Sequence, residues 1–469
     1  MTHHMIIDGE ATEGAGSFDV INPATGDVLG QGPTASQEQV TAAIEAARRA
    51  QPAWAARSSE ERAAMLNQVA DVFEANAAAL AELITKEQGK PLSGPGSMFE
   101  MEAAVGFTRV PAMLDLPPEV VFEDETRVDE LHYDPLGVVA AIAPWNWPVM
   151  IAVWQIMPAV RMGNTVVIKP SELTPLGTLE LVRLINTVLP PGVVNAVSGD
   201  GEVGSWLVSS SDVDKIMFTG SVATGKKVAA AASASLTRTT MELGGNDPAI
   251  IMGDVDPAAI AEGLFWGSFI NMGQTCACAK RLYVHDDVYD AVVDGLVSLA
   301  EAMPMGDGLE EGNVLGPIQN KAQFDKVASF VDQAKASGAT IRTGGAPMEG
   351  NGYFYPITIV TDICDDALLV AEEQFGPAIP VIRFSDNEEA IAKANADELG
   401  LGASVWSSDV EQAKAVAKRL QAGTVWINQH GAVHPMVPFG GAKGSGFGVE
   451  FGVDGLKAVT QPKALSTAK

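Results

Sequence analysis

Cys276 lies in the segment Asn271–Cys278 (NMGQTCAC), directly after a stretch, Pro257–Ile270, whose pattern predicts a helix. A cysteine among small residues in such a loop can be an attacking thiol, because substrate can approach it and a local field can ionise it. For a lone cysteine, a small buried hydrophobe is the more common interpretation. A Cys-x-Cys spacing also suggests a metal site, but the chain has 3 cysteines and no His cluster nearby, so we expect no metal.

Two other polar residues have types and neighbours suited to proton transfer and charge stabilisation. Glu242 ends a strand-like run and precedes two glycines, where backbone can approach a ligand closely. In apolar surroundings its pKa would rise towards neutrality, which suits a general base; an exposed turn residue is the alternative. Asn146 lies in Pro144–Pro148 (PWNWP), and a sterically fixed amide suits a developing oxyanion. The alternative is a structural Asn that hydrogen-bonds its own loop.

Two segments that follow predicted strands could bind a nucleotide. Phe218–Ser221, with Gly225 after it, opens a predicted helix whose backbone N–H groups could hold a pyrophosphate. Its spacing is G-x-x-x-x-G rather than the dinucleotide G-x-G-x-x-G, so the motif is weak alone. Lys169 and Glu172 follow a strand and could hold a ribose, with a solvated turn as the alternative. Gly441–Gly448 is glycine-rich, but no strand leads into it, so we do not expect it to bind phosphate.

The elements that must position these residues alternate between strands and helices. Ser36 and Gln39 predict a capping box for a helix through Arg49, and Glu60–Lys86 predicts a second helix. Predicted strands are Val138–Ile142, Thr165–Ile168, Val193–Val197, Lys215–Phe218, Ala249–Met252, Arg281–Val284, Ala403–Trp406 and Thr424–Ile427. Predicted helices between them are Gly177–Leu189, Gly225–Ala232, Asp286–Ala302, Gln319–Ala336 and Asp409–Leu420. This alternation on both sides of residue 245 indicates two α/β domains with mostly parallel sheets.

Two segments allow more than one interpretation. Gly137–Val160 has no charged residue and is long enough to span a bilayer, but its prolines, Asn146 and Gln155 favour a buried strand, a loop and a helix start that line a binding cavity. Glu123–Tyr133 alternates charged residues and predicts an exposed strand. It is either an arm that pairs with another subunit or an ordinary edge hairpin.

Composition limits the partners. The chain has 59 acidic and 30 basic side chains, a net charge of −29, so we expect neither nucleic acid nor an anionic membrane surface as a partner. The 3 cysteines favour a reducing compartment, and Met1–Asp8 has no apolar core of signal-peptide length, so we expect a cytoplasmic protein.

Seven segments, in this order, resemble motifs of the aldehyde dehydrogenase superfamily: Pro144–Pro148, Gly163–Glu172, Phe218–Gly225, Met241–Gly245, Gly273–Cys276, Glu372–Pro377 and Pro438–Gly441. The separations of 34 residues from Glu242 to Cys276 and 97 from Cys276 to Glu373 also resemble the family's. The resemblance covers nearly the whole chain. It implies a Rossmann-like NAD-binding domain (1–116 and 136–244), a catalytic domain (245–445), both doubly wound α/β, and a small β oligomerisation arm (117–135 and 455–469).

The resemblance also implies roles. Cys276 matches the nucleophile, Glu242 the base that activates water, and Asn146, with the Cys276 N–H, the oxyanion hole. Thr275 and Ala277 replace the thiol that adjoins the family's nucleophile. The implied cofactor-binding residues are Ile142, Trp145, Lys169, Ser171, Glu172, Gly220, Ser221, Leu243, Glu373 and Phe375. The implied substrate tunnel comprises Trp147, Met150, Ile151, Trp154, Ile270, Thr275, His430, Val433 and Phe439.

These assignments predict oxidation of an aldehyde to its acid through a thioester. Glu172 would accept hydrogen bonds from ribose hydroxyls and repel a 2′-phosphate, which favours NAD over NADP. Trp154 stands where semialdehyde-acid members place an arginine, which favours an uncharged, apolar or aromatic aldehyde. A cationic aldehyde held by cation–π contact is a second option, and His430 and His434 could tune the tunnel mouth. Alternatives are a CoA-acylating dehydrogenase and a non-catalytic homologue; we expect a homodimer or homotetramer.

Overall fold

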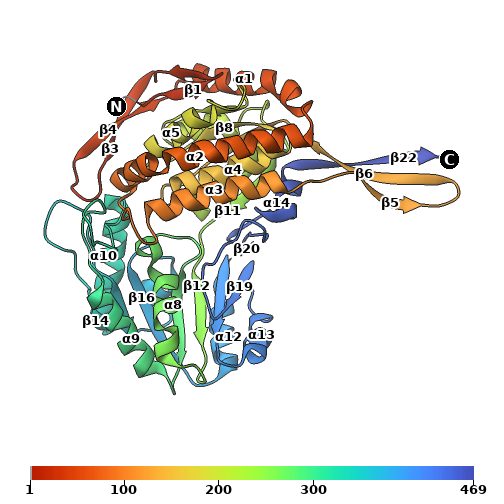
Figure 1. Cartoon of the computed structure of the whole chain (residues 1–469). Helices are drawn as coiled ribbons and strands as arrows, with labels where there is room; N and C mark the ends of the chain where they lie inside the picture. The colour runs from red at the N-terminus through yellow and green to blue at the C-terminus, as the bar shows by residue number, and fades with distance from the viewer. Residues whose placement is uncertain (1–2) are drawn as a thin grey trace.

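The computed structural model describes residues 3–469 and contains two parallel sheets with helices on both faces (Figure 1). The first sheet has the order β2-β1-β9-β8-β7-β10-β11-β21, and its five middle strands are parallel. Its strands are β1 (Met5–Ile7), β2 (Glu10–Thr12), β7 (Val138–Ile142), β8 (Thr165–Lys169), β9 (Val194–Ala196), β10 (Lys215–Thr219), β11 (Arg238–Glu242) and β21 (Gly446–Phe447).

Helices bury both faces of this sheet because its strands are apolar on both sides. On one face Val139, Ala141 and Ile168 pack against α2–α5, and on the other Val138 and Ile216 pack against α1, α6 and α7. The helices are α1 (Gln37–Ala55), α2 (Ser59–Gln88), α3 (Ser97–Met113), α4 (Pro148–Arg161), α5 (Leu176–Ile185), α6 (Gly201–Val208) and α7 (Val222–Ser233).

The second sheet has the order β14-β15-β16-β13-β12-β18-β19 and is parallel except at β14. Its strands are β12 (Asp247–Ile251), β13 (Ala279–His285), β14 (Thr340–Thr343), β15 (Thr358–Thr361), β16 (Ala378–Phe384), β18 (Gly402–Trp406) and β19 (Thr424–Ile427). The helices around it are α8 (Pro257–Phe269), the 3-10 turn η1 (Ile270–Gly273), α9 (Tyr289–Ala302), α10 (Lys321–Ala336), α11 (Leu368–Ala371), α12 (Asn387–Asn395) and α13 (Val410–Ala417).

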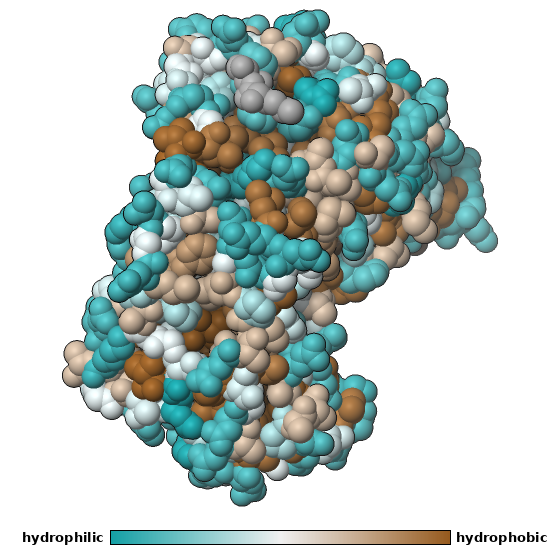
Figure 2. Space-filling model, turned by 60° about the vertical axis from the view of Figure 1, so that its left-hand side comes forward, coloured by the Kyte–Doolittle hydropathy of each residue, from teal (hydrophilic) through white to brown (hydrophobic). Residues whose placement is uncertain are grey.

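A three-stranded antiparallel arm projects from the body on the right of Figure 1. It contains β5 (Glu119–Glu123), β6 (Arg127–Pro135) and β22 (Thr460–Ala468), and β22 pairs with β6 along its whole length. The remaining elements are β3 (Gly16–Ile21), β4 (Val28–Thr34), β17 (Leu399–Gly400), β20 (Ala442–Lys443) and α14 (Gly452–Ala458). On the face in Figure 2, hydrophilic side chains are interspersed with apolar ones.

All eight predicted strands and the predicted helices are present, with ends shifted by a few residues. The capping box is confirmed, because Ser36 Oγ accepts from the Gln39 N–H and the Gln39 side chain accepts from the Ser36 N–H. Helix α5 ends at Ile185 rather than Leu189, since the Asn186 side chain donates to the Val182 and Val194 carbonyls and turns the chain.

The sequence patterns did not predict β16 or α3. β16 is a middle strand of the second sheet, but Pro380 and Arg383 interrupt its apolar run. Gly137–Val160 forms β7, a loop and α4, as predicted, and within residues 3–469 no helix is long and apolar enough to cross a membrane.

Helix α2 ends at Gly89, which turns the chain sharply towards Lys90. Gly89 has φ +94°, and a Cβ there would lie 2.8 Å from Pro23 Cγ and from Pro317 Cγ. Gly94 also has a positive φ, +62°, but a Cβ there would meet nothing within 4 Å. Comparing alanine substitutions at the two glycines therefore distinguishes the cost of backbone strain from the cost of a steric clash.

We expect Gly94→Ala to lower the free energy of unfolding by about 1 kcal/mol, the ordinary strain of a left-handed alanine. Gly89→Ala should cost at least about 1 kcal/mol more, because the prolines must also move. Urea unfolding followed by circular dichroism measures both. Equal losses would show that the contacts around Gly89 are loose.

Candidate active site

The carboxyl ends of four parallel strands meet at one edge of the first sheet. The register pairs Ile142 with Lys169, Phe218 with Ile142, and Thr219 with Glu242. Ligands bind at this edge in open α/β sheets. A cavity of about 600 Å³ lies there, and seven of the ten residues predicted to bind cofactor line it: Ile142, Trp145, Lys169, Ser171, Glu172, Gly220 and Ser221.

This cleft has the groups that a dinucleotide requires. Lys169 Nζ is buried, donates to the Pro170 carbonyl at 2.8 Å and lies 3.7 Å from Glu172 Oε2; burial lowers its pKa. Ser221 is the N-cap of α7, its Oγ accepts from the Thr224 N–H, and both residues line the cleft, which places the N-terminus of that helix beside it. A Cβ at Gly201 would meet nothing within 4 Å, which leaves the floor open.

A second cavity, of about 180 Å³, brings the predicted catalytic residues together. Cys276, Glu242 and Asn146 all line it, as do the other three predicted cofactor residues, Leu243, Glu373 and Phe375. It shares Trp145, Gly220 and Ser221 with the larger cleft, so the two are continuous.

Cys276 is positioned by a reversal of the chain after α8. Asn271, Met272 and Gly273 all have left-handed φ values, between 51° and 69°, and a Cβ at Gly273 would lie 2.4 Å from the Gly376 carbonyl oxygen. Burial raises the pKa of the Cys276 thiol, and the carboxylates of Glu373 and Glu242 raise it further. Both effects oppose ionisation of the thiol, so a nucleophilic role for Cys276 would require a neighbouring group that takes its proton.

Glu242 is buried at the end of β11, so it is not an exposed turn residue. Within residues 3–469, neither of its carboxylate oxygens has a hydrogen-bond partner. Burial raises the pKa of Glu242, and the nearby Glu450 carboxylate raises it further. The glycine-rich run near the C-terminus packs over this residue, because β21 pairs Gly446 with Glu242 and a Cβ at Gly440 would lie 3.4 Å from Glu242 Oε1.

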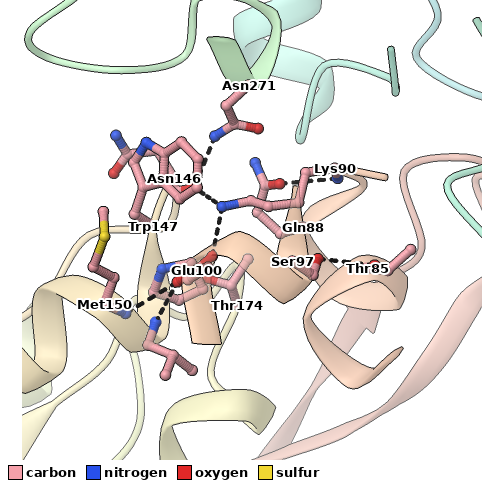
Figure 3. Close-up of polar contacts among 12 residues, drawn as sticks. Thr85, Gln88, Lys90, Ser97, Glu100, Asn146, Trp147, Met150, Thr174 and Asn271 are labelled. Carbon is pink, nitrogen blue, oxygen red and sulfur yellow. Dashed lines mark hydrogen bonds and ion pairs between the residues drawn. The ribbon is translucent and has the colours of Figure 1, made fainter. Parts of the chain in front are cut away.

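Asn146 begins the turn into α4 and is 3% exposed. Its side-chain Nδ2 donates one hydrogen bond, to the Gln274 carbonyl at 2.9 Å, which leaves its second N–H available. Its backbone carbonyl accepts from Lys90 Nζ and from Asn271 Nδ2, each at 2.8 Å (Figure 3). Asn146 is thus held through both its side chain and its backbone carbonyl, and all three partners lie outside its own loop.

Glu373 lines the small cavity together with Cys276 and Glu242. It accepts from the Gly245 N–H at 3.2 Å, and burial raises its pKa to about 7. Phe375 has a left-handed φ of 48° and packs edge-on to Trp145 at 5.3 Å.

A third cavity, of about 460 Å³, opens from the other side of Cys276. All nine residues predicted to contact substrate line it, together with Phe99, Phe107 and Trp266, which the sequence analysis missed. Phe99 and Phe107 lie on the unpredicted helix α3, whereas Trp266 lies four residues before Ile270 and could have been found from helical spacing. His434 is exposed and follows Val433, which lines this cavity; its Nδ1 accepts from the Met436 N–H, and its place at the mouth stays a prediction.

The aldehyde dehydrogenase family model matches residues 10–465. Aldehyde dehydrogenase LUC3 of Fusarium sp is 40% identical over 466 residues, which cover 99% of this chain and 98% of that one. A betaine aldehyde dehydrogenase of Sinorhizobium fredii is 40% identical over 474 residues, with 98% and 96% covered. The NAD+ complex of an aldehyde dehydrogenase from Bacillus cereus is 36% identical at a TM-score of 0.96, with 100% and 97% covered.

The chain therefore belongs to the aldehyde dehydrogenase family. The predicted family, fold and class of enzyme, an aldehyde dehydrogenase, are confirmed.

The carboxylate of Glu450 provides a test of the acid–base behaviour of Glu242. Glu242 accepts a proton only when ionised, so activity that depends on it is lost as pH falls through its pKa. Because Glu450 raises that pKa, Glu450→Gln should lower it and move the acid limb of kcat to lower pH. Glu87→Gln, at another buried carboxyl, is the control and should leave the limb in place. An acid limb unchanged in Glu450→Gln would contradict the coupling.

Proposed function

We propose that this enzyme oxidises an uncharged, apolar or aromatic aldehyde to its carboxylic acid, with Cys276 as nucleophile, Glu242 as base and Asn146 in the oxyanion hole. The observation that carries the proposal is the position of Cys276. It lines both the small cavity that holds Glu242 and Asn146 and the apolar cavity, so an aldehyde in the latter can present its carbonyl to all three side chains.

The cofactor is NAD, and the cleft residues fit it. Lys169 and Glu172 would hold the adenosine ribose, and the N-terminus of α7 would hold the pyrophosphate. The Glu172 carboxylate would repel a 2′-phosphate, which disfavours NADP. When bound, NAD accepts a hydride from the carbon attached to sulfur.

In the first half of the reaction, the Cys276 sulfur forms a bond to the aldehyde carbon while its proton passes to a neighbouring base. Glu242 can accept this proton, because its oxygens are unpartnered in the described chain and its raised pKa reduces the mismatch with the thiol. The free N–H of Asn146 and the Cys276 N–H stabilise the carbonyl oxygen as it becomes negative. Loss of hydride then leaves a thioester on Cys276.

In the second half, Glu242, after it has released the thiol proton to bulk water, removes a proton from water as the water oxygen attacks the thioester carbon. The carbon–sulfur bond breaks, the acid departs and the sulfur regains a proton. Splitting the oxidation into these two steps avoids one difficult direct step.

The cavity supports an uncharged substrate. Aromatic rings of Phe99, Phe107, Trp147, Trp154, Trp266 and Phe439 line it, and none of its lining residues is Asp, Glu, Lys or Arg. A substrate carboxylate would have no cationic partner there, and burying it unpaired would be costly.

A cationic aldehyde is the second candidate, supported by the aromatic walls and by the betaine aldehyde dehydrogenase relatives. One observation weighs against it. Lys90 Nζ already lies 3.5 Å from the ring centroid of Trp147, and a second cation at the same ring would be repelled by the first.

Hydrolysis rather than transfer to CoA is supported by Glu242, which can activate water; CoA-acylating relatives generally lack this carboxylate. A non-catalytic homologue would have no reason to keep Glu242 buried with unpartnered oxygens. Acyl-CoA formed in the presence of CoA would favour the CoA-acylating alternative.

We also propose that the chain divides as expected into NAD-binding, catalytic and arm segments, and that the arm joins subunits into a homodimer or homotetramer. Exposed Val120, Val121, Phe122 and Leu465 on its strands support this, because apolar side chains on a projecting sheet gain from burial. A cytoplasmic location is supported by three free cysteines.

Stopped-flow measurement of NADH separates the two catalytic residues. Cys276→Ala should abolish NADH formation, because no thioester can form. Glu242→Gln should still give a burst of NADH, a slower one because Glu242 also takes the thiol proton, and should slow steady turnover by roughly 10²-fold or more, since water is no longer activated. Turnover retained in Cys276→Ala, or an unchanged steady rate in Glu242→Gln, would refute these roles.

A panel of aldehydes, read by NADH absorbance with NAD and with NADP, tests the substrate class. We expect kcat/KM for an aromatic or long apolar aldehyde to exceed that for a carboxylate-bearing semialdehyde by at least about 10²-fold, from the cost of burying the charge. Trimethylammonio-acetaldehyde is the cationic comparison. A preference for the semialdehyde or for the cation would overturn the proposal of an uncharged substrate.

A further inference from the structure

Lys90, which follows α2, and Glu100, on α3, form a buried ion pair. Lys90 Nζ lies 2.6 Å from Glu100 Oε2, and both side chains are fully shielded from solvent. Figure 3 shows this pair between the Asn146 turn and helix α3. Removing two charges from water offsets most of their attraction, so such a pair adds little net stability. The effect of the pair is instead to hold in place the backbone groups that it contacts.

Each partner contacts the turn that carries Asn146 and Trp147. Lys90 Nζ donates to the Asn146 carbonyl at 2.8 Å and lies against the Trp147 ring. Glu100 Oε1 accepts from the N–H groups of Val149 and Met150, at 2.9 and 3.0 Å. Helix α4 has no capping side chain of its own, so Glu100 supplies its N-terminal cap from α3.

The Asn146 carbonyl accepts a second hydrogen bond, from the turn η1 that follows α8. Asn271 Nδ2 donates to it at 2.8 Å from the left-handed turn that leads to Cys276. The Asn146 side chain is anchored separately, to the Gln274 carbonyl. With its carbonyl held by Lys90 and Asn271, Asn146 cannot rotate its peptide plane without breaking buried hydrogen bonds.

We propose that the Lys90–Glu100 pair, with Asn271, is a positioning device for the oxidation step: it clamps the Asn146 carbonyl so that the free N–H of the side chain points at the developing oxyanion beside Cys276. The inference rests on the proposed role of Asn146. Lys90 does not touch substrate, so it is a positioning residue and not a catalytic one.

A comparison within the chain separates this role from simple helix capping. Glu87 is equally buried and caps α5, since its oxygens accept from the Leu176 and Gly177 N–H groups at 2.8 Å. Within residues 3–469 it forms no ion pair with lysine, and its side chain forms no hydrogen bond to the Asn146 turn. Glu87→Gln is therefore the matched control for loss of a buried capping carboxylate.

The test compares Glu100→Gln with Lys90→Met/Glu100→Gln. In Glu100→Gln the amide oxygen can still cap α4, and the buried amine of Lys90 can lose its proton and still donate to Asn146. The double variant adds the loss of that donor and of the amine's contact with the Trp147 ring, and it leaves no unpaired charge. We expect its NADH burst rate to fall on the order of 10-fold or more below that of Glu100→Gln, from misplacement of the amide.

Three further readouts distinguish positioning from a general loss of structure. NAD affinity, measured by fluorescence quenching, should stay within about threefold of the parent in all variants, because the cofactor cleft is not altered. Glu87→Gln should keep the parental burst rate. Adding Lys90→Met to Asn146→Ala/Glu100→Gln should slow the burst no further, because the amide it positions is already gone.

A burst rate in the double variant equal to that of Glu100→Gln, or a full 10-fold loss retained in the Asn146→Ala background, would overturn the inference. If the double variant does not fold, Asn271→Gly removes the other donor to the same carbonyl at a backbone position that glycine accepts, and an unchanged burst rate overturns the clamp. An Asn146→Ala enzyme with a normal burst rate would instead refute the proposed oxyanion hole itself.

Discussion

The small cavity lined by Cys276, Glu242 and Asn146 depends on three hydrogen bonds between the Asn146 turn, which follows β7 of the first sheet, and the segment that precedes β13 of the second sheet. Asn146 Nδ2 donates to the Gln274 carbonyl, Asn271 Nδ2 to the Asn146 carbonyl, and Trp147 Nε1 to Thr275 Oγ1, all between 2.8 and 2.9 Å. Each contributes about 1 kcal/mol net, but a buried group left unpaired costs about 1–3 kcal/mol. These bonds therefore hold the Cys276 loop against the Asn146 turn mainly because breaking them would leave buried groups unpaired.

The burial that these contacts produce also shifts the pKa values of the acidic side chains around the cavity. Burial raises the pKa of Glu373 to about 7 and of Glu450 to about 8, and it also raises that of Glu242. Burial therefore disfavours several negative charges together around this cavity, in a chain whose net charge is −29.

The sequence predicted those parts of the site that depend on local pattern. Lys169 and Glu242 end apolar strands, and parallel strands bring their carboxyl ends to one edge, so their proximity follows from the strand predictions. Motif resemblance supplied the roles of Cys276 and Asn146. Lys90 and Glu100 gave no such signal, because their pairing depends on α3, whose burial by α2 and α4 no local pattern reports. β16 was missed because a proline usually argues against an interior strand. Pro380 nevertheless lies in one, opposite Val360 of β15.

The walls of the substrate cavity differ in how freely they can change. Trp147 and Thr275 are joined by a hydrogen bond that also ties the two units together, and Trp147 packs on Lys90 as well. Altering either side chain would disturb the position of Asn146 along with the shape of the cavity. Phe99 on α3 also packs edge-on to the Trp147 ring, at 6.1 Å between centroids. Trp266 lines the same cavity from α8, and its side chain donates no hydrogen bond in the described chain. The cavity can therefore be reshaped for other aldehydes from that side, while the side next to Asn146 stays constrained by the geometry of the reaction.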